Sequence, residues 1–219
     1  MPKKYVNLDV GRPHNMVEIV VAVFDLEGFT KFFNSVDGEN RIIIVNEFMR
    51  DFIKWFENRM TEENDYPPNF SKFLGDGFLI IWETQTPPNE STENIVDRCW
   101  EIVLGELGYK EYFLPEFLKK HPNWKYDYPP GLRVGVAWGA SIKYEKEYLS
   151  NAINIASRLA NIHPQLYFLA TTNTYRKKII DRERWHVQKI PLKGIASSVE
   201  IFADKRNVIN IFNRCEIVI

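Results

Sequence analysis

The sequence predicts an α+β fold: a ferredoxin-like βαββαβ core extended by C-terminal strands and a helix. Apolar runs of strand length alternate with longer segments of helical periodicity, in the order β-α-α-β-β-α-β-β-α-β-α-β-β. The first part of that order places helices on one face of a sheet. With 219 residues, 45% of them hydrophobic, the chain can bury a full core as one domain. We expect that domain at 17–205, between an arm at 1–16 and a tail at 206–219.

The first half of the chain opens on a buried strand. Ile19–Phe24 is an uninterrupted apolar run, which predicts a strand over 17–25, and helical spacing follows at 29–35 and 38–62. In the longer helix the apolar residues keep mostly to one face: Ile42, Ile43, Val45, Phe48, Met49, Phe52, Trp55 and Phe56. Such a stripe indicates core or interface packing rather than a cofactor site.

A hairpin follows the long helix. Asp76-Gly77 between apolar runs is a strong hairpin signal and predicts strands at 70–75 and 77–83. A helix is expected at 91–107, and the segment 108–130, rich in aromatic residues, lysine and proline, has the character of an insertion. The remaining expected elements are a strand at 131–139 paired with 140–144, a helix at 150–162, a strand at 166–170, a short helix at 172–180, and strands at 185–191 and 198–203.

Composition excludes several classes of protein. A formal charge of −1 and a pI near 6.5 leave no electrostatic footprint for nucleic acid or an anionic membrane. No apolar run approaches the ~20 residues of a membrane span, and the start of the chain has no signal-peptide core. The two cysteines, Cys99 and Cys215, have no metal-ligand spacing, which favours a reduced, cytoplasmic protein.

Two aspartates carry the strongest chemical signal. Asp25 ends the first apolar strand and Asp76 lies in the hairpin turn, so each carboxylate is held at the edge of the core. Brought together on neighbouring strands, they would form a hard-oxygen site for Mg²⁺ or Mn²⁺. The loop after Asp25 opens a helix, whose free N–H groups can bind phosphate. Its residues are Glu27, Gly28, Phe29 and Thr30. Together these features suggest nucleoside triphosphate chemistry.

A third motif lies on the helix expected at 150–162. Asn154 and Arg158 are four residues apart and so point the same way. By itself such a pair is commonly just a solvated surface. Small residues at positions 152, 156 and 160 would let the helix pack closely and hold the pair in place.

These motifs resemble those of class III nucleotidyl cyclases. Five short segments occur in the order seen in that family, over about residues 17–203: Phe24–Thr30, Lys72–Phe78, Leu132–Gly139, Asn154–Arg158 and Leu192–Gly194. The resemblance implies the cyclase fold, built on the ferredoxin-like core. It also implies an enzyme that converts a nucleoside triphosphate to a 3′,5′-cyclic monophosphate and pyrophosphate.

The resemblance assigns roles to individual residues. Asp25 and Asp76, with the backbone carbonyl of Leu26, would bind two Mg²⁺ or Mn²⁺ ions, one activating the ribose 3′-hydroxyl and one anchoring the triphosphate. Asn154 would orient the ribose, and Arg158 would stabilise charge developing on the α-phosphoryl oxygens. Family members place the aspartates and the Asn/Arg pair on opposite subunits. We therefore expect a homodimer with two composite sites, in which the long helix and the strand around Leu132 find partners.

The base-recognising positions are less clearly defined. By motif spacing they fall on Lys72 and Glu147, a pair closer to the adenylate than to the guanylate cyclase pattern. A lysine donor and a carboxylate acceptor could equally meet uracil or cytosine, or be two solvated strand-edge charges. Lys193 belongs to a family Lys-Gly motif, but the position two residues later, where many members carry a phosphate-contacting lysine, is Ile195.

The architecture is similar to that of the stand-alone pyrimidine cyclases of bacterial Pycsar antiphage systems. That resemblance favours UTP as substrate, with CTP possible, and a cyclic nucleotide that activates a separate effector. Two alternatives stay open: an adenylate cyclase, supported by Lys72 and an acidic partner, and an inactive cyclase-homology module. Retention of Asp25, Asp76, Asn154 and Arg158 disfavours the module. The hairpin signature of diguanylate cyclases is absent from the sequence.

Overall fold

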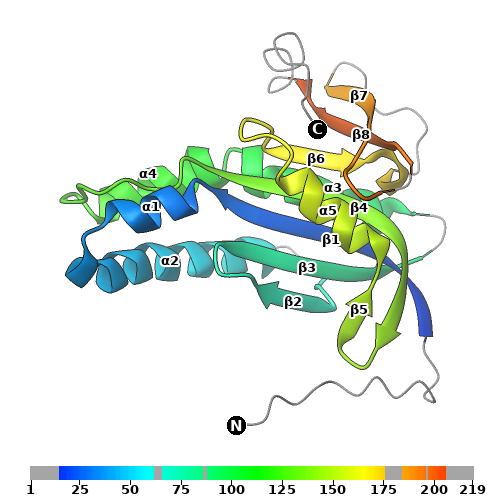
Figure 1. Ribbon diagram of the computed structural model, residues 1–219, viewed down its shortest axis with the longest axis horizontal. Helices are drawn as coiled ribbons and strands as arrows, with labels where there is room; N and C mark the ends of the chain where they lie inside the picture. Colours follow the sequence, from blue (N-terminus) through cyan, green and yellow to red (C-terminus); the bar gives the residue numbers. More distant parts are fainter. Residues whose placement is uncertain (1–14, 62–65, 86–87, 176–183, 196, 206–219) are drawn as a thin grey trace.

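One mixed sheet of eight strands forms the centre of the molecule (Figure 1). The computed structural model describes residues 15–61, 66–85, 88–175, 184–195 and 197–205. The strands are β1 (Asn15–Glu27), β2 (Phe70–Phe73), β3 (Gly77–Thr84), β4 (Gly131–Tyr144), β5 (Glu147–Leu149), β6 (Phe168–Thr171), β7 (Trp185–Ile190) and β8 (Val199–Asp204). Their order across the sheet is β2-β3-β1-β4-β6-β8-β7, with β5 paired to β4.

Helices cover both faces of this sheet. They are α1 (Phe29–Ser35), α2 (Gly38–Thr61), α3 (Glu90–Leu104), a π-helix η1 (Tyr109–Phe113), α4 (Leu114–Lys120), α5 (Asn151–Ala160) and a 3₁₀ turn η2 (Thr172–Thr174). The order β2-β3-β1-β4, with β1 antiparallel to both of its neighbours, is that of a ferredoxin-like βαββαβ unit. The predicted α+β class and core are therefore confirmed.

The side chains of β1 divide between two cores because successive residues of a strand point to opposite faces. Val20, Ala22 and Phe24 face the main core, which the apolar stripe of α2 fills together with α3, η1 and α4. Val21 and Val23 face the other way, where the small-residue face of α5 covers them. Strand β1 is thus buried on both faces and paired along both edges.

Helix α5 packs on the sheet at backbone distance. Its buried face consists of Ala152, Ala156 and Ala160, as expected from their spacing. A Cβ atom built on Gly135 of β4 would lie 2.1 Å from the carbonyl oxygen of Ala156. A Cβ on Gly139, one turn along the helix, would lie 3.6 Å from the Ala152 Cβ, an ordinary contact. The close approach is therefore concentrated at Gly135.

The predicted hairpin between 131–139 and 140–144 is wrong. Residues 131–144 form one continuous strand, because Gly139 stays in the ladder opposite Ile19 instead of turning. The turn comes later, where Glu145 adopts a left-handed conformation with φ of 54°, and β5 returns along β4. Glycine inside a strand here serves close packing, not chain reversal.

Three other expectations change. The segment 108–130 is part of the core, since Tyr109, Phe113 and Phe117 are buried against α2. The short helix expected at 172–180 is only the 3₁₀ turn η2, followed by extended backbone at Tyr175, and its remainder lies outside the described residues. Strand β1 is longer than expected and begins at Asn15. The arm before it and the tail from residue 206 also lie outside the described residues.

The expected dimer contacts need revision for two segments. Leu132 is 1% exposed and packs in the main core, so the strand around it needs no second chain to bury it. The α2 stripe is likewise buried within the chain from Val45 onward. Only Ile42 and Ile43, 72% and 66% exposed, lie outside that core.

We predict that Gly135→Ala strongly destabilises the fold and that Gly139→Ala does not. The added methyl group at position 135 would clash with the backbone of α5 and force the helix to move, which should lower the free energy of unfolding by about 2–4 kcal/mol. Position 139 has room for the methyl group. Urea unfolding of both variants measures the difference. Equal stabilities of the two variants would contradict the close packing of α5 on β4.

Candidate active site

Asp25 lies near the end of β1, on the sheet face that α5 covers. Its backbone position is opposite Gly77 of β3 and Arg133 of β4. Only 17% of its side chain is exposed. Because two neighbouring strands hold the backbone here, the carboxylate is fixed near the end of a central strand.

Asp76 is brought beside Asp25 by the β2–β3 turn. The N–H of Leu26 donates a hydrogen bond of 2.9 Å to the Asp76 carbonyl oxygen, which ties the turn to the end of β1. A Cβ on Gly77 would lie 1.9 Å from the carbonyl oxygen of Phe24, so only glycine fits at this crossing. The structure thus brings the two predicted metal aspartates together.

Arg133 is a site residue that sequence reasoning missed. Its guanidinium forms an ion pair with the Asp25 carboxylate and donates a hydrogen bond of 3.3 Å to the Asn161 side chain. Its Nε is buried and has no hydrogen-bond partner within the described part of the chain. Arg133 could have been found only from the strand register, because residues paired across two strands share a face of the sheet. The sequence does not show which residues pair.

The electrostatics of Asp25 favour a cation. Burial raises the pKa of this carboxyl group, the Arg133 guanidinium lowers it, and the nearby Asp76 charge raises it again. The pKa of Asp25 remains above its ordinary value, so the ionised form is under-compensated by Arg133 alone. A divalent cation between the two carboxylates would supply the missing positive charge.

The donor set fits Mg²⁺ or Mn²⁺. Two carboxylates are hard oxygen ligands, and Mg²⁺ is commonly held by one or two carboxylates together with substrate phosphates and water. No cluster of three or more His, Cys, Asp or Glu side chains that could hold a metal occurs among the described residues. A pair of carboxylates suits an ion that completes its shell with oxygen atoms of a bound substrate.

The loop after β1 has the form expected of a phosphate-binding turn. Gly28 caps α1 in a left-handed conformation with φ of 68°, and no side chain caps the helix start. The N–H groups of the first turn, including those of Phe29 and Thr30, therefore lack a capping acceptor. The Glu27 Oε2 atom is buried without a hydrogen-bond partner among the residues described.

Asn154 and Arg158 both lie on α5, and the Arg158 guanidinium reaches the β7–β8 connection. The terminal nitrogens of Arg158 lie against Gly194, 3.2 and 3.3 Å from where its Cβ would be. Its Nη1 is buried and has no hydrogen-bond partner in the described ranges. Asn154 is exposed. Ile195, at the position where the sequence resemblance implies a phosphate-contacting lysine in many class III cyclases, packs against the small core around Leu159.

The two halves of the predicted site are not joined within one chain. Gly194 belongs to the β7–β8 connection, whereas Asp25 and Asp76 lie where β1 meets the β2–β3 hairpin. Strands β4 and β6 separate these regions in the sheet order. In this chain the Arg158 guanidinium therefore lies against Gly194 and not beside the aspartates.

The structure does not join Lys72 and Glu147 either. Lys72 lies on the α5 face of β2, as does Phe70, whose ring is 5.9 Å from that of Tyr148. Glu147 neighbours Tyr148 on β5 and so points to the other face. The Glu83 carboxylate, not Glu147, accepts hydrogen bonds of 2.6 Å from the Tyr148 hydroxyl and the Lys143 ammonium group.

Comparison with known proteins identifies the fold. No family model and no curated protein matches the chain. Among solved structures it is similar to the guanylyl cyclase Cya2, with a TM-score of 0.60 and 17% identity over 88% of this chain and 94% of the other. It is also similar to the adenylyl cyclase CyaB from P. aeruginosa, with a TM-score of 0.58 and 16% identity over 88% and 96%.

A bacterial light-regulated adenylyl cyclase shows the same likeness, with a TM-score of 0.54 and 14% identity over 90% of this chain and 55% of the other. At these identities the comparisons establish the fold, which is that of adenylyl and guanylyl cyclase structures. Separately, none of the described helices combines the length and apolar character needed to cross a bilayer.

We predict that Mn²⁺ stabilises the protein through the two aspartates. Saturating Mn²⁺ at about 100 times its Kd should add about 2.7 kcal/mol and raise Tm. Asp25→Asn and Asp76→Asn should each remove most of this shift, while Asp127→Asn, an exposed aspartate elsewhere, should keep it. The shift should also shrink as the pH is lowered toward the raised pKa of Asp25, because protons compete with the ion.

Thermal unfolding with and without Mn²⁺ measures this effect for each variant. A Tm shift of wild-type size in both Asp25→Asn and Asp76→Asn would show that the ion binds elsewhere.

Proposed function

We propose that this chain is a metal-dependent nucleotidyl cyclase, which converts a nucleoside triphosphate to its 3′,5′-cyclic monophosphate and pyrophosphate. The observation that carries the proposal is the juxtaposition of Asp25 and Asp76 at the end of β1, beside an uncapped helix start. The cyclase fold and the order of the sequence motifs support it.

In this proposal Asp25, Asp76 and the Leu26 carbonyl hold two Mg²⁺ or Mn²⁺ ions. Bound there, the ions supply Lewis-acid activation of the 3′-hydroxyl and neutralise charge on the triphosphate. Positioning and electrostatic stabilisation suffice for phosphoryl transfer, so the chain needs no covalent nucleophile.

The remaining groups near Asp25 bind the triphosphate. The N–H groups from Glu27 to Thr30 donate to phosphate oxygens, as helix starts do. Arg133 reaches Asp25 with one guanidinium nitrogen and keeps its buried Nε without a partner among described groups. It can therefore hold a phosphate oxygen while staying fixed by Asn161.

Asn154 and Arg158 serve the site of a second copy. Their separation from Asp25 within one chain supports a homodimer in which each site takes aspartates from one subunit and the Asn/Arg pair from the other. Asn154 orients the ribose, and Arg158 stabilises the negative charge that develops on the α-phosphoryl group.

We further propose a pyrimidine substrate, UTP rather than CTP. Its support is the sequence resemblance to Pycsar cyclases, with Lys72, on the α5 face of β2, as a base contact. Glu147, which lies on the other face of the sheet, is no longer assigned to the base. The cyclic product would act in the cytoplasm, as an antiphage messenger read by a separate effector. Adenylate cyclase activity is the alternative that Lys72 also fits.

Incubation with each of the four NTPs and Mn²⁺, followed by mass identification of products, tests this function. We expect cyclic UMP from the wild type and from Asp127→Asn. We expect Asp76→Ala to reduce the rate by about a thousandfold or more, as loss of an essential electrostatic group does.

No cyclic product from any NTP, or an Asp76→Ala rate equal to wild type, would leave the inactive module as the better account. Cyclic AMP as the only product would contradict the pyrimidine assignment but would still support the proposal that the chain is a nucleotidyl cyclase.

A further inference from the structure

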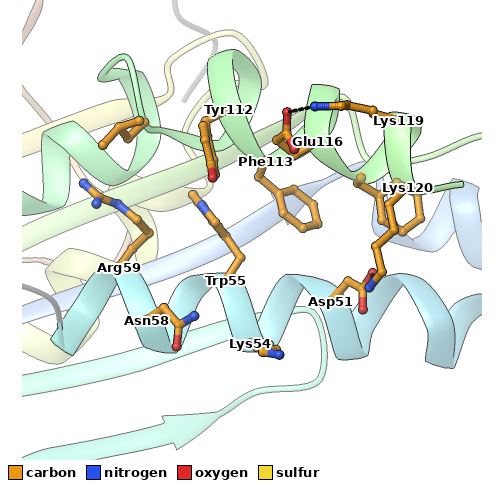
Figure 2. Close-up of a pocket in the computed structure, with 12 residues that line it drawn as sticks. Asp51, Lys54, Trp55, Asn58, Arg59, Tyr112, Phe113, Glu116, Lys119 and Lys120 are labelled. Atoms are coloured by element: carbon orange, nitrogen blue, oxygen red, sulfur yellow. Dashed lines mark hydrogen bonds and ion pairs between the residues drawn. The ribbon is translucent and has the colours of Figure 1, made fainter.

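A cleft lies on the face of the sheet opposite the one that α5 covers. It is a cleft of about 650 Å³ between α2 and the η1–α4 segment (Figure 2). That volume is in the range of pockets that hold small organic ligands. The cyclase proposal gives this cleft no role.

Aromatic rings form one wall of the cleft. Trp55 of α2 packs against Phe113 of η1 with ring centroids 5.1 Å apart, and Phe117 of α4 continues the wall 5.9 Å beyond Phe113. Tyr112, 42% exposed, also lines the cleft from η1. Such a wall favours an apolar or aromatic ligand body.

One buried donor in this wall, the Trp55 indole N–H, has no acceptor among the described residues. The Trp55 side chain is nine-tenths buried, and its Nε1 has no hydrogen-bond partner in the part of the chain that the structure describes. Figure 2 shows the indole nitrogen directed away from α2, toward Tyr112. A buried indole N–H usually finds a partner, so an acceptor atom on a ligand would satisfy a group that the protein leaves unsatisfied.

The rim of the cleft is positively charged. Its lysine side chains are Lys54, Lys119 and Lys120, against the two acidic ones Asp51 and Glu116, so one lysine is in excess. Glu116 pairs with Lys119 at 3.3 Å, and Asp51 pairs with Lys120 at 2.7 Å. Lys54 is exposed beside Trp55. The rim therefore favours an anionic group over a neutral or cationic one.

We propose that this cleft binds a small organic anion with an apolar body. The body lies on the aromatic wall, an acceptor atom meets the Trp55 indole N–H, and the anionic group meets Lys54 at the rim. The site is independent of the proposed cyclase chemistry, since its walls come from α2, η1 and α4 and it contains none of the proposed catalytic residues.

Two fluorescent probes that differ mainly in charge test this proposal. 8-Anilino-1-naphthalenesulfonate has the same aromatic body as N-phenyl-1-naphthylamine and adds a sulfonate. We expect saturable 1:1 binding of the sulfonate to the wild type, about tenfold or more tighter than binding of the neutral amine.

Three variants locate the bound probe. Lys54→Gln and Trp55→Phe should each weaken sulfonate binding about fivefold or more, the first by removing charge and the second by removing only the N–H. Lys189→Gln, at an exposed lysine on β7, should leave the affinity unchanged. Because Lys54 is exposed, its variant folds regardless of how Trp55→Phe behaves.

Wild-type affinity in both Lys54→Gln and Trp55→Phe, equal affinity for the two probes, or no saturable binding would each overturn the proposal. A sulfonate that fails to bind while Lys54→Gln alters the self-association of the chain would likewise overturn it and make the cleft a protein interface.

Discussion

The pairing of β1 with β3 on one edge and β4 on the other is the constraint on which the rest of the structure depends. This register places Asp25 opposite Gly77 and Arg133, and so decides which groups surround the carboxylate. It can form only because position 77 has no Cβ to strike the Phe24 carbonyl. On the same sheet Gly135 admits α5 at backbone distance, which fixes the helix that carries Asn154 and Arg158.

Within one chain the two carboxylates and Arg158 lie apart. Burial of Asp25 and the nearby Asp76 charge outweigh the Arg133 guanidinium and leave the Asp25 carboxyl with a raised pKa. Arg158 lies beside Gly194, with β4 and β6 between that loop and β1 in the sheet order, and its buried Nη1 finds no hydrogen-bond partner among the described residues. In the proposed homodimer, the aspartates of one subunit and the Asn154/Arg158 pair of the other would complete each site.

Features that depend on local sequence were predictable. The apolar run of β1, the stripe of α2 and the Asp-Gly turn that carries Asp76 all follow from periodicity and turn chemistry. Features that depend on strand register, that is, on which residues pair across neighbouring strands, were not predictable. Arg133 became a site residue only through its register with Asp25, and Glu147 moved away from Lys72 through strand alternation. The hairpin predicted at Gly139 was wrong because a glycine in a strand can mark either a turn or close packing.

Mixing two inactive variants tests the central claim, a site shared between subunits, most directly. Asp25→Ala and Arg158→Ala chains lose different halves of the site, so each should be inactive alone. Mixed in equal amounts and allowed to exchange, they should recover about a quarter of wild-type activity, because half of the dimers are mixed and each of those has one intact site. No recovered activity in a sample shown by native mass spectrometry to contain mixed dimers would contradict the account.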